Sequence, residues 1–473
     1  YRVYFMIIGA FVIIFVVWLL IRRYHEKFIR AYGLFFLILL FFVMNKGEGN
    51  QIDEFSEGVF SPLSMLRWIS LGWLLWVSLR TPRPNGYRSD AALWTLGGLL
   101  LADILISTFY ADDFGYSFMR ATSFIILAAA IPLGFARHLY WRLNCIRFFR
   151  FHYYIAWCLL VPAMLLHLVG LHNFGVSVIM GSYAGPFANQ NMFGIFSAFI
   201  IPYVLFHWRV EARQKLLQKL DAILLAILVI GLWLSNSRSG MLACIIAVAI
   251  YFFVINTKNR LKILAVAACL VLGLLVFSDA RQEIMRFVRK DTVERAEVTD
   301  LSSQFYQERR YELWSNILPL YWEKKMKGYG FAMSHQLTLP FSGNRYSPRH
   351  AHNSYIELFG DLGLPGLMLL LLIIYFISLR STALVQRSGN YLQRNINAVF
   401  IAVFISGTIN AFFESWMFSA GSILSLMFWG PAAGVIAQWV WGPATAADNV
   451  KVMHIKHRGI EQAEAAQRVT RWY

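Results

Sequence analysis

Residues Leu367–Leu379 read LMLLLLIIYFISL, an apolar run without a single charged residue. A run of this composition is typical of a helix inside hydrocarbon. The stretch before it, RHAHNSYIELFGDLGLPG at Arg349–Gly366, begins with charged and imidazole side chains and ends in glycine and proline. The sequence thus places two histidines at the mouth of a membrane helix.

The composition of the whole chain also indicates a membrane protein. Of its 473 residues, 58% are hydrophobic and only 15% are charged, which is more apolar surface than a water-soluble chain of this length can bury. The first apolar run has the appearance of a signal-peptide core but lacks a small-residue cleavage site, so we interpret it as a span. The four cysteines are scattered, without metal-ligand spacing, and are expected to be small buried hydrophobes.

Apolar runs long enough to cross a bilayer recur along the sequence. They predict an all-α polytopic membrane protein with about 12–13 transmembrane helices. The predicted spans lie near residues 4–21, 31–44, 62–79, 91–109, 118–136, 153–172, 190–207, 220–234, 240–255, 261–278, 363–379, 396–413 and 418–439.

Short loops rich in lysine and arginine alternate with loops that are acidic or polar. The positive-inside rule predicts that the basic loops are cytoplasmic, so the net charge of +17 reflects membrane topology rather than nucleic-acid binding. The other loops, including the long segment 279–353, are predicted on the opposite face. The basic loops fall at residues 22–30, 80–88, 137–150, 209–219, 258–262 and 380–394.

The predicted spans and loops divide the chain into four parts. The longest departure from hydrocarbon should be a loop domain with helices that lie on the outer surface of the membrane. The expected parts are an N-terminal transmembrane bundle at 1–278, the loop domain at 279–353, C-terminal transmembrane helices at 354–440 and a cytoplasmic tail at 441–473.

Two arginines on the predicted outer side are candidate anion-binding residues. Arg238 lies in SNSRSGML, a short turn whose small residues permit close approach of a ligand. Arg310 shares a helical face with Trp314 and Ile317 in the stretch QFYQERRYELWSNILPLYW. Because a guanidinium matches phosphate oxygens in a bidentate manner, a diphosphate is the expected ligand. The alternatives are that Arg238 snorkels to the interface and that Arg310 pairs with a neighbouring glutamate.

The histidine motif supplies a candidate base. His352 stands where the loop meets the membrane helix and can accept a proton near neutral pH, and His350 is the weaker candidate. Asn353 and Glu357 are candidates to orient the imidazole, and Trp314 is a candidate supporting residue. The alternatives are that His352 is an ordinary hydrogen-bonded loop histidine and that Glu357 is a capping or membrane-interface residue. Two cations and a base beside a bilayer predict group transfer from a lipid diphosphate to an acceptor hydroxyl.

The order and spacing of several motifs resemble the superfamily of O-antigen ligases and O-antigen polymerases, which also includes bacterial protein O-oligosaccharyltransferases. The matching stretches cover roughly residues 180–380. They are GPFANQNMFG before a span, SNSRSGMLA, RYELW, GYG and HNSYIELFGDLGLPGL.

The resemblance implies a GT-C-like glycosyltransferase that takes a glycan from undecaprenyl diphosphate at the periplasmic face of the bacterial inner membrane, without metal or another cofactor. Ligases of the superfamily pass the glycan to lipid A-core, and polymerases pass it to another repeat unit. Carried over to this sequence, the resemblance implies that Arg238 and Arg310 bind the diphosphate and that His352 is catalytic. We favour the ligase reaction.

Two other function classes were weighed against this transferase. A transporter of lipid-linked glycans would need ionisable groups at the membrane midplane, and Asp103 is the main one in these spans. A metal-dependent transferase would use Asp112 and Asp113 in YADDFGYS, although an ordinary solvated loop is the better interpretation of that pair. Since the polar residues are concentrated in an outer loop, surface chemistry is the favoured hypothesis.

Overall fold

The structure is a computed structural model. The predicted span at 4–21 and the predicted tail at 441–473 lie outside the residues that it describes, and so does the predicted span at 261–278 except for residues 261 and 262. The described residues are 27–45, 62–81, 90–139, 142–170, 177–179, 182–187, 189–212, 214–235, 237–256, 258–262, 309–338, 350–388 and 390–440.

Long apolar helices make up most of these residues, which confirms the all-α polytopic class. Within this part of the chain, nine helices are long and apolar enough to cross a membrane, and α2 (Lys27–Asn45) and α3 (Pro62–Arg80) have 19 residues each. The other long helices are α4 (Ala91–Ser107), α5 (Phe114–His138), α6 (Arg142–Leu168), α7 (Gln190–Phe206), α8 (Lys215–Ser235), α9 (Arg238–Ile255), α15 (Ser354–Arg387), α16 (Tyr391–Asn410) and α17 (Ile423–Val440).

Short elements connect some of these helices. A 3-10 turn follows α4 and a π-helical turn follows α7. Where only a loop was predicted, β1 and β2 form an antiparallel hairpin. The short elements are η1 (Thr108–Tyr110), β1 (Ser177–Ile179), β2 (Ser182–Gly185), η2 (His207–Glu211), α13 (Arg309–Glu323) and α14 (Ser334–Thr338).

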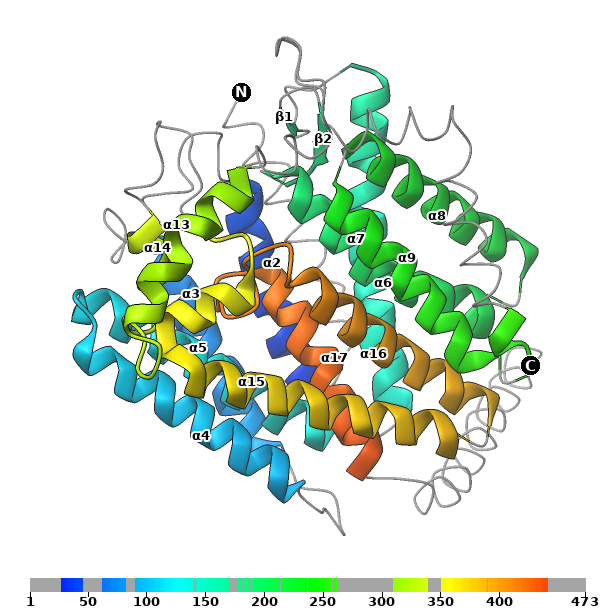
Figure 1. Ribbon diagram of the computed structural model, residues 1–473. Helices are drawn as coiled ribbons and strands as arrows, with labels where there is room; N and C mark the ends of the chain where they lie inside the picture. The colour runs from blue at the N-terminus through cyan, green and yellow to red at the C-terminus, as the bar shows by residue number, and fades with distance from the viewer. Residues whose placement is uncertain are drawn as a thin grey trace.

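Successive helices run in opposite directions, so their connections gather at two ends of the bundle (Figure 1). The starts of α5, α7, α9 and α15 and the ends of α4 and α16 lie at one end, which we call the site end. Basic residues such as Arg80, Arg137 and Arg387 lie at the other. The helix order therefore agrees with the predicted alternation of basic and polar loops.

Helix α9 packs against both α7 and α16 (Figure 1). Gly194 of α7 and Gly240 of α9 allow the backbones to touch, because a Cβ on Gly240 would lie 2.5 Å from the Cα of Gly194. Small residues at crossings let membrane helices approach closely. This contact holds the start of α9, and with it Arg238, against the first turns of α7.

Helix α15 is broken at Gly363, where φ is 70°. A Cβ there would lie 2.6 Å from the carbonyl oxygen of Lys325, and the Leu364 N–H donates to that same oxygen at 2.7 Å. The span predicted near 363–379 thus begins at this break and continues to Arg387. The residues before the break form a separate short helix that the sequence analysis did not anticipate.

Helix α13 covers that short helix from the site end (Figure 1). It forms over the described part of the stretch for which helical spacing was predicted. Its apolar face joins the start of α15 in a buried cluster of Leu313, Ile317, Tyr321, Ala351 and Phe359. Burial raises the pKa of Tyr321, so its hydroxyl stays protonated and donates to the carbonyl of Ser334 at 3.3 Å. The loop after α13 is therefore tied to the histidine segment by packing.

The GYG motif, residues 328–330, locks the same region by backbone contacts. The N–H groups of Tyr329 and Gly330 donate to the carbonyls of Gly360 and Asp361, both at 2.9 Å. Gly328 has a φ of 68°, and a Cβ on it would lie 2.2 Å from the Asp361 carbonyl oxygen. Only glycine fits at so close an approach.

Candidate active site

His352 lies directly before α15 in a strained backbone conformation. Its φ of 51° places a non-glycine residue in the left-handed region, which costs free energy unless the surroundings hold it. Both neighbours are anchored. The Trp314 indole N–H donates to the Ala351 carbonyl at 2.7 Å, and the Asn353 N–H donates to the Ser415 hydroxyl at 3.0 Å. These contacts set the direction of the imidazole.

The imidazole of His352 has a carboxylate partner that the sequence analysis missed. Its Nδ1 lies 3.1 Å from Oε2 of Glu414, and the two side chains are 28% and 11% exposed. Because an ionised carboxylate can only accept, Nδ1 carries the hydrogen and Nε2 of the neutral ring is left as an acceptor. The Asn191 amide donates to Oε1 of Glu414 at 2.7 Å, which orients the carboxylate from α7.

Asn353 acts on the helix rather than on the imidazole. Its Oδ1 accepts from the N–H groups of Tyr355 and Ile356 at 2.9 and 3.1 Å. This is an N-cap, which satisfies donors that the first turn of a helix otherwise leaves unpaired. The cap fixes where α15 begins and hence where His352 stands.

Glu357 pairs with the other histidine. Its Oε1 accepts from the Ala351 N–H at 3.0 Å and lies 3.3 Å from Nδ1 of His350. His350 is 54% exposed, so it is the more open of the two imidazoles. Each histidine of the motif therefore has its own carboxylate, and Ala351 between them is held at both its N–H and its carbonyl.

Arg238 is the first residue of α9, and its side chain is half-buried. Two hydrogen bonds connect this helix start with the loop that carries Glu414. Asn410 donates to the Ser239 carbonyl at 3.1 Å, and the Trp416 indole donates to Asn410 at 3.0 Å. The candidate arginine and the candidate base thus lie at the same end of the bundle.

Arg310 is the second residue of α13. Its side chain lies outside the described residues, so its predicted role in binding a diphosphate stays a prediction.

Residues 411–422, which we call the α16–α17 loop, organise this end of the molecule. The Ser354 hydroxyl donates to the Glu414 carbonyl at 2.8 Å and accepts from the Trp416 N–H at 3.2 Å. The Ser354 N–H donates to the Ala411 carbonyl at 2.8 Å. No candidate residue was predicted in this loop, because two apolar runs bracket it. The available signal was Glu414 itself, an acidic residue between the spans predicted at 396–413 and 418–439.

A cavity of about 290 Å³ opens beside the α16–α17 loop. His350 and the acidic partners of both histidines line it. His352 is not among the lining residues and is linked to the cavity by its contact with Glu414. The lining also contains two arginines that the sequence analysis did not single out, Arg67 of α3 and Arg120 of α5. The cavity is therefore polar, with the imidazole of His350, three carboxylates and two guanidinium groups around it.

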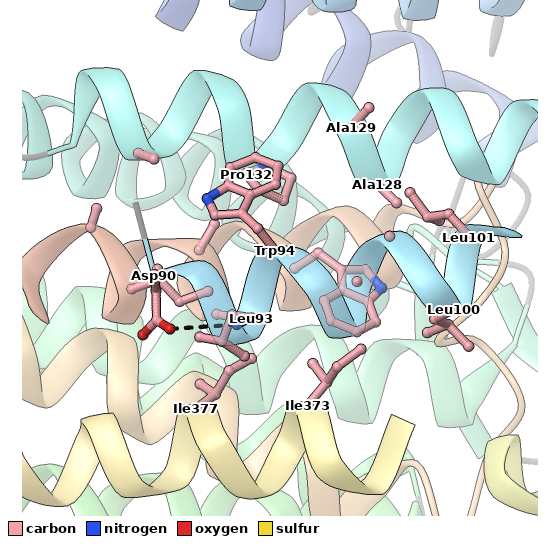
Figure 2. A pocket seen from close by; sticks show the side chains of 18 of the residues that line it. Asp90, Leu93, Trp94, Leu100, Leu101, Ala128, Ala129, Pro132, Ile373 and Ile377 are labelled. Atoms are coloured by element: carbon pink, nitrogen blue, oxygen red, sulfur yellow. Dashed lines mark hydrogen bonds between the residues drawn. The ribbon is translucent and has the colours of Figure 1, made fainter. Parts of the chain in front are cut away.

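A second cavity, also of about 290 Å³, lies between α4, α5, α15 and α17 and has an almost entirely apolar lining (Figure 2). Phe124 lines it, and its ring centroid lies 5.9 Å from that of Phe331 and 5.4 Å from that of Phe418. Both partner rings line the polar cavity. One aromatic layer thus separates the two cavities. Asp90, paired with Arg380 at 2.9 Å, lies at the end of the apolar cavity away from the site end.

The aspartates considered for a transporter or a metal-dependent transferase lie on or beside α4 and α5. Asp113 caps α5, since its side chain accepts from the Tyr116 N–H at 2.9 Å, which favours the loop interpretation of that pair. Asp103 packs against α15, and a Cβ on Gly366 would lie 3.0 Å from its Oδ2. Among the side chains that the structure describes, no group of three or more His, Cys, Asp and Glu residues could hold a metal ion.

Comparison with known proteins identifies one family. Residues 223–371 match the model of the O-antigen ligase family. The matched region contains the start of α9, the described part of the loop domain and the first half of α15, but not α3, α5, α7 or the α16–α17 loop. No curated protein matches the chain.

Proposed function

Because residues 223–371 place this chain in the O-antigen ligase superfamily, we propose that it is a glycosyltransferase of the ligase type, which moves a glycan from undecaprenyl diphosphate to a hydroxyl of lipid A-core. The proposed reaction takes place at the periplasmic face of the bacterial inner membrane, without a metal ion. The superfamily and the multi-pass helical fold support a lipid-linked glycan as the substrate class.

The proposed reaction consists of one proton transfer and one bond exchange. Nε2 of His352 takes the proton of the acceptor hydroxyl, and the acceptor oxygen attacks the anomeric carbon of the donor sugar. The bond between that carbon and the diphosphate oxygen breaks, and its electron pair leaves with undecaprenyl diphosphate. Arg238 and Arg310 stabilise the negative charge that develops on the leaving diphosphate.

The observation that carries this proposal is the hydrogen bond between His352 and Glu414. It leaves Nε2 as the acceptor nitrogen and keeps a negative charge behind the ring, where it stabilises the imidazolium formed during transfer. The strained φ of His352 supports the same conclusion, since such strain concentrates at functional sites. The base is thus pre-oriented before a substrate binds.

His350 is a second candidate for the base, because it lines the polar cavity directly and has its own carboxylate, Glu357. Its greater exposure argues against it, since a general base gains from a fixed orientation. We therefore assign it a supporting role toward the acceptor, and the two histidines are separated by the experiment described next.

The test measures donor binding and turnover separately for His352→Ala and His350→Ala in nanodiscs. His352→Ala should bind lipid-linked donor normally but lose about 10² to 10⁴ in rate, the usual effect of removing a general base. His350→Ala should lose much less. Normal turnover in His352→Ala, or a loss explained entirely by weaker donor binding, would remove the base assignment.

Two related reactions use the same chemistry. A polymerase would pass the glycan to another repeat unit, and a protein O-oligosaccharyltransferase would pass it to a protein hydroxyl. A gene deletion separates them from a ligase. Loss of a ligase leaves free polymer on its lipid carrier, loss of a polymerase leaves single repeats on the core, and loss of the protein-directed enzyme leaves unglycosylated protein. A transporter is disfavoured because the predicted spans are nearly free of charge, with Asp103 as the main exception.

A further inference from the structure

Two arginines lie within the membrane-entering turns of the N-terminal half, outside the region that matches the family. Arg67 lies near the start of α3 and Arg120 near the start of α5, so both are at the site end. Both side chains are half-buried, and both line the polar cavity and a smaller adjoining cavity. Charged side chains at such positions face a bundle interior or water-filled cavity and are by default candidates for a functional site.

We propose that Arg67 and Arg120 form an anion-binding site for a phosphate group on the acceptor lipid, distinct from the arginines assigned to the donor diphosphate. The inference rests on the proposed function, since it concerns the second substrate of that reaction. It assigns to the N-terminal helices the recognition of the acceptor, and to the family-matched region the recognition of the donor.

The first support is the placement of the two guanidinium groups around one opening. A Cβ added to Gly421 would lie 2.8 Å from Nη1 of Arg67, so that guanidinium rests on the far end of the α16–α17 loop. The Tyr116 hydroxyl accepts from Nε and Nη2 of Arg120 at 3.2 and 3.0 Å, which holds that guanidinium in one orientation. A fixed guanidinium loses little freedom when it binds a phosphate.

The second support is the arrangement of charge within the cavity. The same loop carries Glu414 toward His352 and Gly421 toward Arg67. The carboxylates that line the cavity belong to Glu357 and Asp361 of α15 and to Glu414, the partner of His352. A negative ligand group is therefore repelled from that side and attracted to the arginine side, while its neutral hydroxyl can approach the side that holds His350.

The third support is chemical fit. A guanidinium offers several N–H donors in a plane and suits a phosphate better than a neutral sugar. An acceptor that carries both phosphate and hydroxyl groups would be held at two points, and a second fixed point orients the hydroxyl toward the base. The assignment thus gives a role to the two guanidinium groups that line this cavity.

The experiment uses the full chain in nanodiscs and measures binding and transfer separately. The variants are Arg67→Gln, Arg120→Gln and the double variant, with Arg67→Lys and Arg120→Lys in case the uncharged variants fold poorly. Arg80→Gln is the matched control, because Arg80 lies on α3 but at its other end. The probes are lipid A-core with its phosphates, the same lipid after enzymatic dephosphorylation, and lipid-linked donor.

The double variant should bind the phosphorylated acceptor about ten- to a hundred-fold more weakly, which corresponds to charge-assisted hydrogen bonds. It should bind donor as the wild type does, and both proteins should bind the dephosphorylated acceptor equally weakly. The lysine variants should show a smaller loss, and the control should show none.

Other outcomes overturn the inference. Equal binding of the two acceptor forms by the wild-type protein, or unchanged acceptor binding in the double variant, removes the phosphate site. Weakened donor binding with unchanged acceptor binding assigns the pair to the donor instead. If the wild-type protein binds phosphorylated acceptor through these arginines but transfers nothing, the proposed function fails while this inference stands.

Discussion

His352 combines a left-handed backbone, a carboxylate partner and a position at the start of a membrane helix. Each feature has its own cause in neighbouring residues: Trp314 holds the carbonyl before it, Asn353 caps the helix after it, and Glu414 faces its ring. In the proposed reaction the lipid of the donor holds the diphosphate at the membrane surface, so a base must be fixed at that same depth. At the scale of single residues, the site is thus a histidine whose direction is set from three sides.

We expect Glu414→Gln to disable the site by changing the tautomer of His352. Asn191 donates to one oxygen of Glu414, so the glutamine oxygen would turn toward Asn191 and its NH₂ group toward Nδ1. That nitrogen would then have to accept, and Nε2 would carry the hydrogen and could not act as a base. The transfer rate should fall by about 10² to 10⁴, with donor binding unchanged.

The double variant Glu414→Gln, Asn191→Ala is the sharper measurement. Without Asn191 the glutamine amide is free to rotate and to present its oxygen to Nδ1, so part of the lost rate should return. If the double variant is no faster than Glu414→Gln, the tautomer explanation does not hold.

Arg238→Ala and Arg310→Ala should each weaken the interaction with the leaving diphosphate. Charge-assisted hydrogen bonds contribute about 1.5–3 kcal/mol each, so activity should fall by about ten- to a hundred-fold. Lysine variants should recover little, because a single ammonium lacks the planar fork of a guanidinium. Turnover at matched protein level is the measurement, with Arg309→Ala as a control for Arg310. Full activity of Arg310→Ala would exclude that residue from the site.

At the scale of elements, the site depends on two irregular features rather than on long helices. The break in α15 at Gly363 separates a short helix under the loop domain from the membrane span. The α16–α17 loop folds back onto the start of α15 through Ser354. Together they form a fixed connection between the helix that follows His352 and the loop that carries Glu414.

We expect Gly363→Ala to destabilise the protein. The φ of 70° is unfavourable for alanine, and its Cβ would lie 2.6 Å from the Lys325 carbonyl oxygen. A residue forced into this region costs about 1–3 kcal/mol, so the melting temperature in detergent should fall. Gly97→Ala on α4 is the matched control, because a Cβ there meets no atom within 4 Å and alanine favours a helix interior by about 1 kcal/mol over glycine. Equal effects of the two variants would contradict this account.

At the scale of the whole molecule, the alternating helix direction collects the site at one end (Figure 1). The predicted basic loops lie at the other end, as at Arg80, Arg137 and Arg387. The polar cavity draws on α3, α5, α7, α15 and the α16–α17 loop. The apolar cavity beside it offers surroundings that suit the hydrocarbon part of a lipid-linked donor (Figure 2). The apolar cavity thus adjoins the polar one near Phe124 and extends from there toward the opposite end of the bundle, where Asp90 lies.

The site end should face the periplasm. We expect Ser419→Cys, in a background without the four native cysteines, to react with a membrane-impermeant maleimide added to intact cells. Thr81→Cys, at the opposite end, should react only after permeabilisation. The positive-inside rule is the physical reason, since the basic loops stay on the cytoplasmic side. The reverse labelling pattern would invert the topology and remove the periplasmic assignment.

The sequence by itself determined the class of the protein, the helix order and much of the histidine motif. Apolar runs of this length form helices in a bilayer, because backbone N–H and C=O groups in hydrocarbon must hydrogen-bond within their own helix. That rule is local, so each helix from α4 to α9 and from α15 to α17 overlaps a predicted run, although α6 begins well before its run and α15 extends beyond its run at both ends. The same locality explains why Arg238 and His352 could be named as candidates before their surroundings were known.

Only the tertiary structure decided which groups act on those candidates. Glu414, Arg67 and Arg120 lie far from His352 along the chain. Glu414 lies between two predicted spans, and Arg67 and Arg120 lie within predicted spans, so the apolar pattern gives no sign that they line one cavity. Their meeting depends on how α3, α5, α7 and α16 pack, and helix packing in a membrane is set by small residues and surface shape rather than by hydrophobicity. Since apolar patterning is nearly uniform across these spans, it determines that each helix forms but leaves open which faces meet.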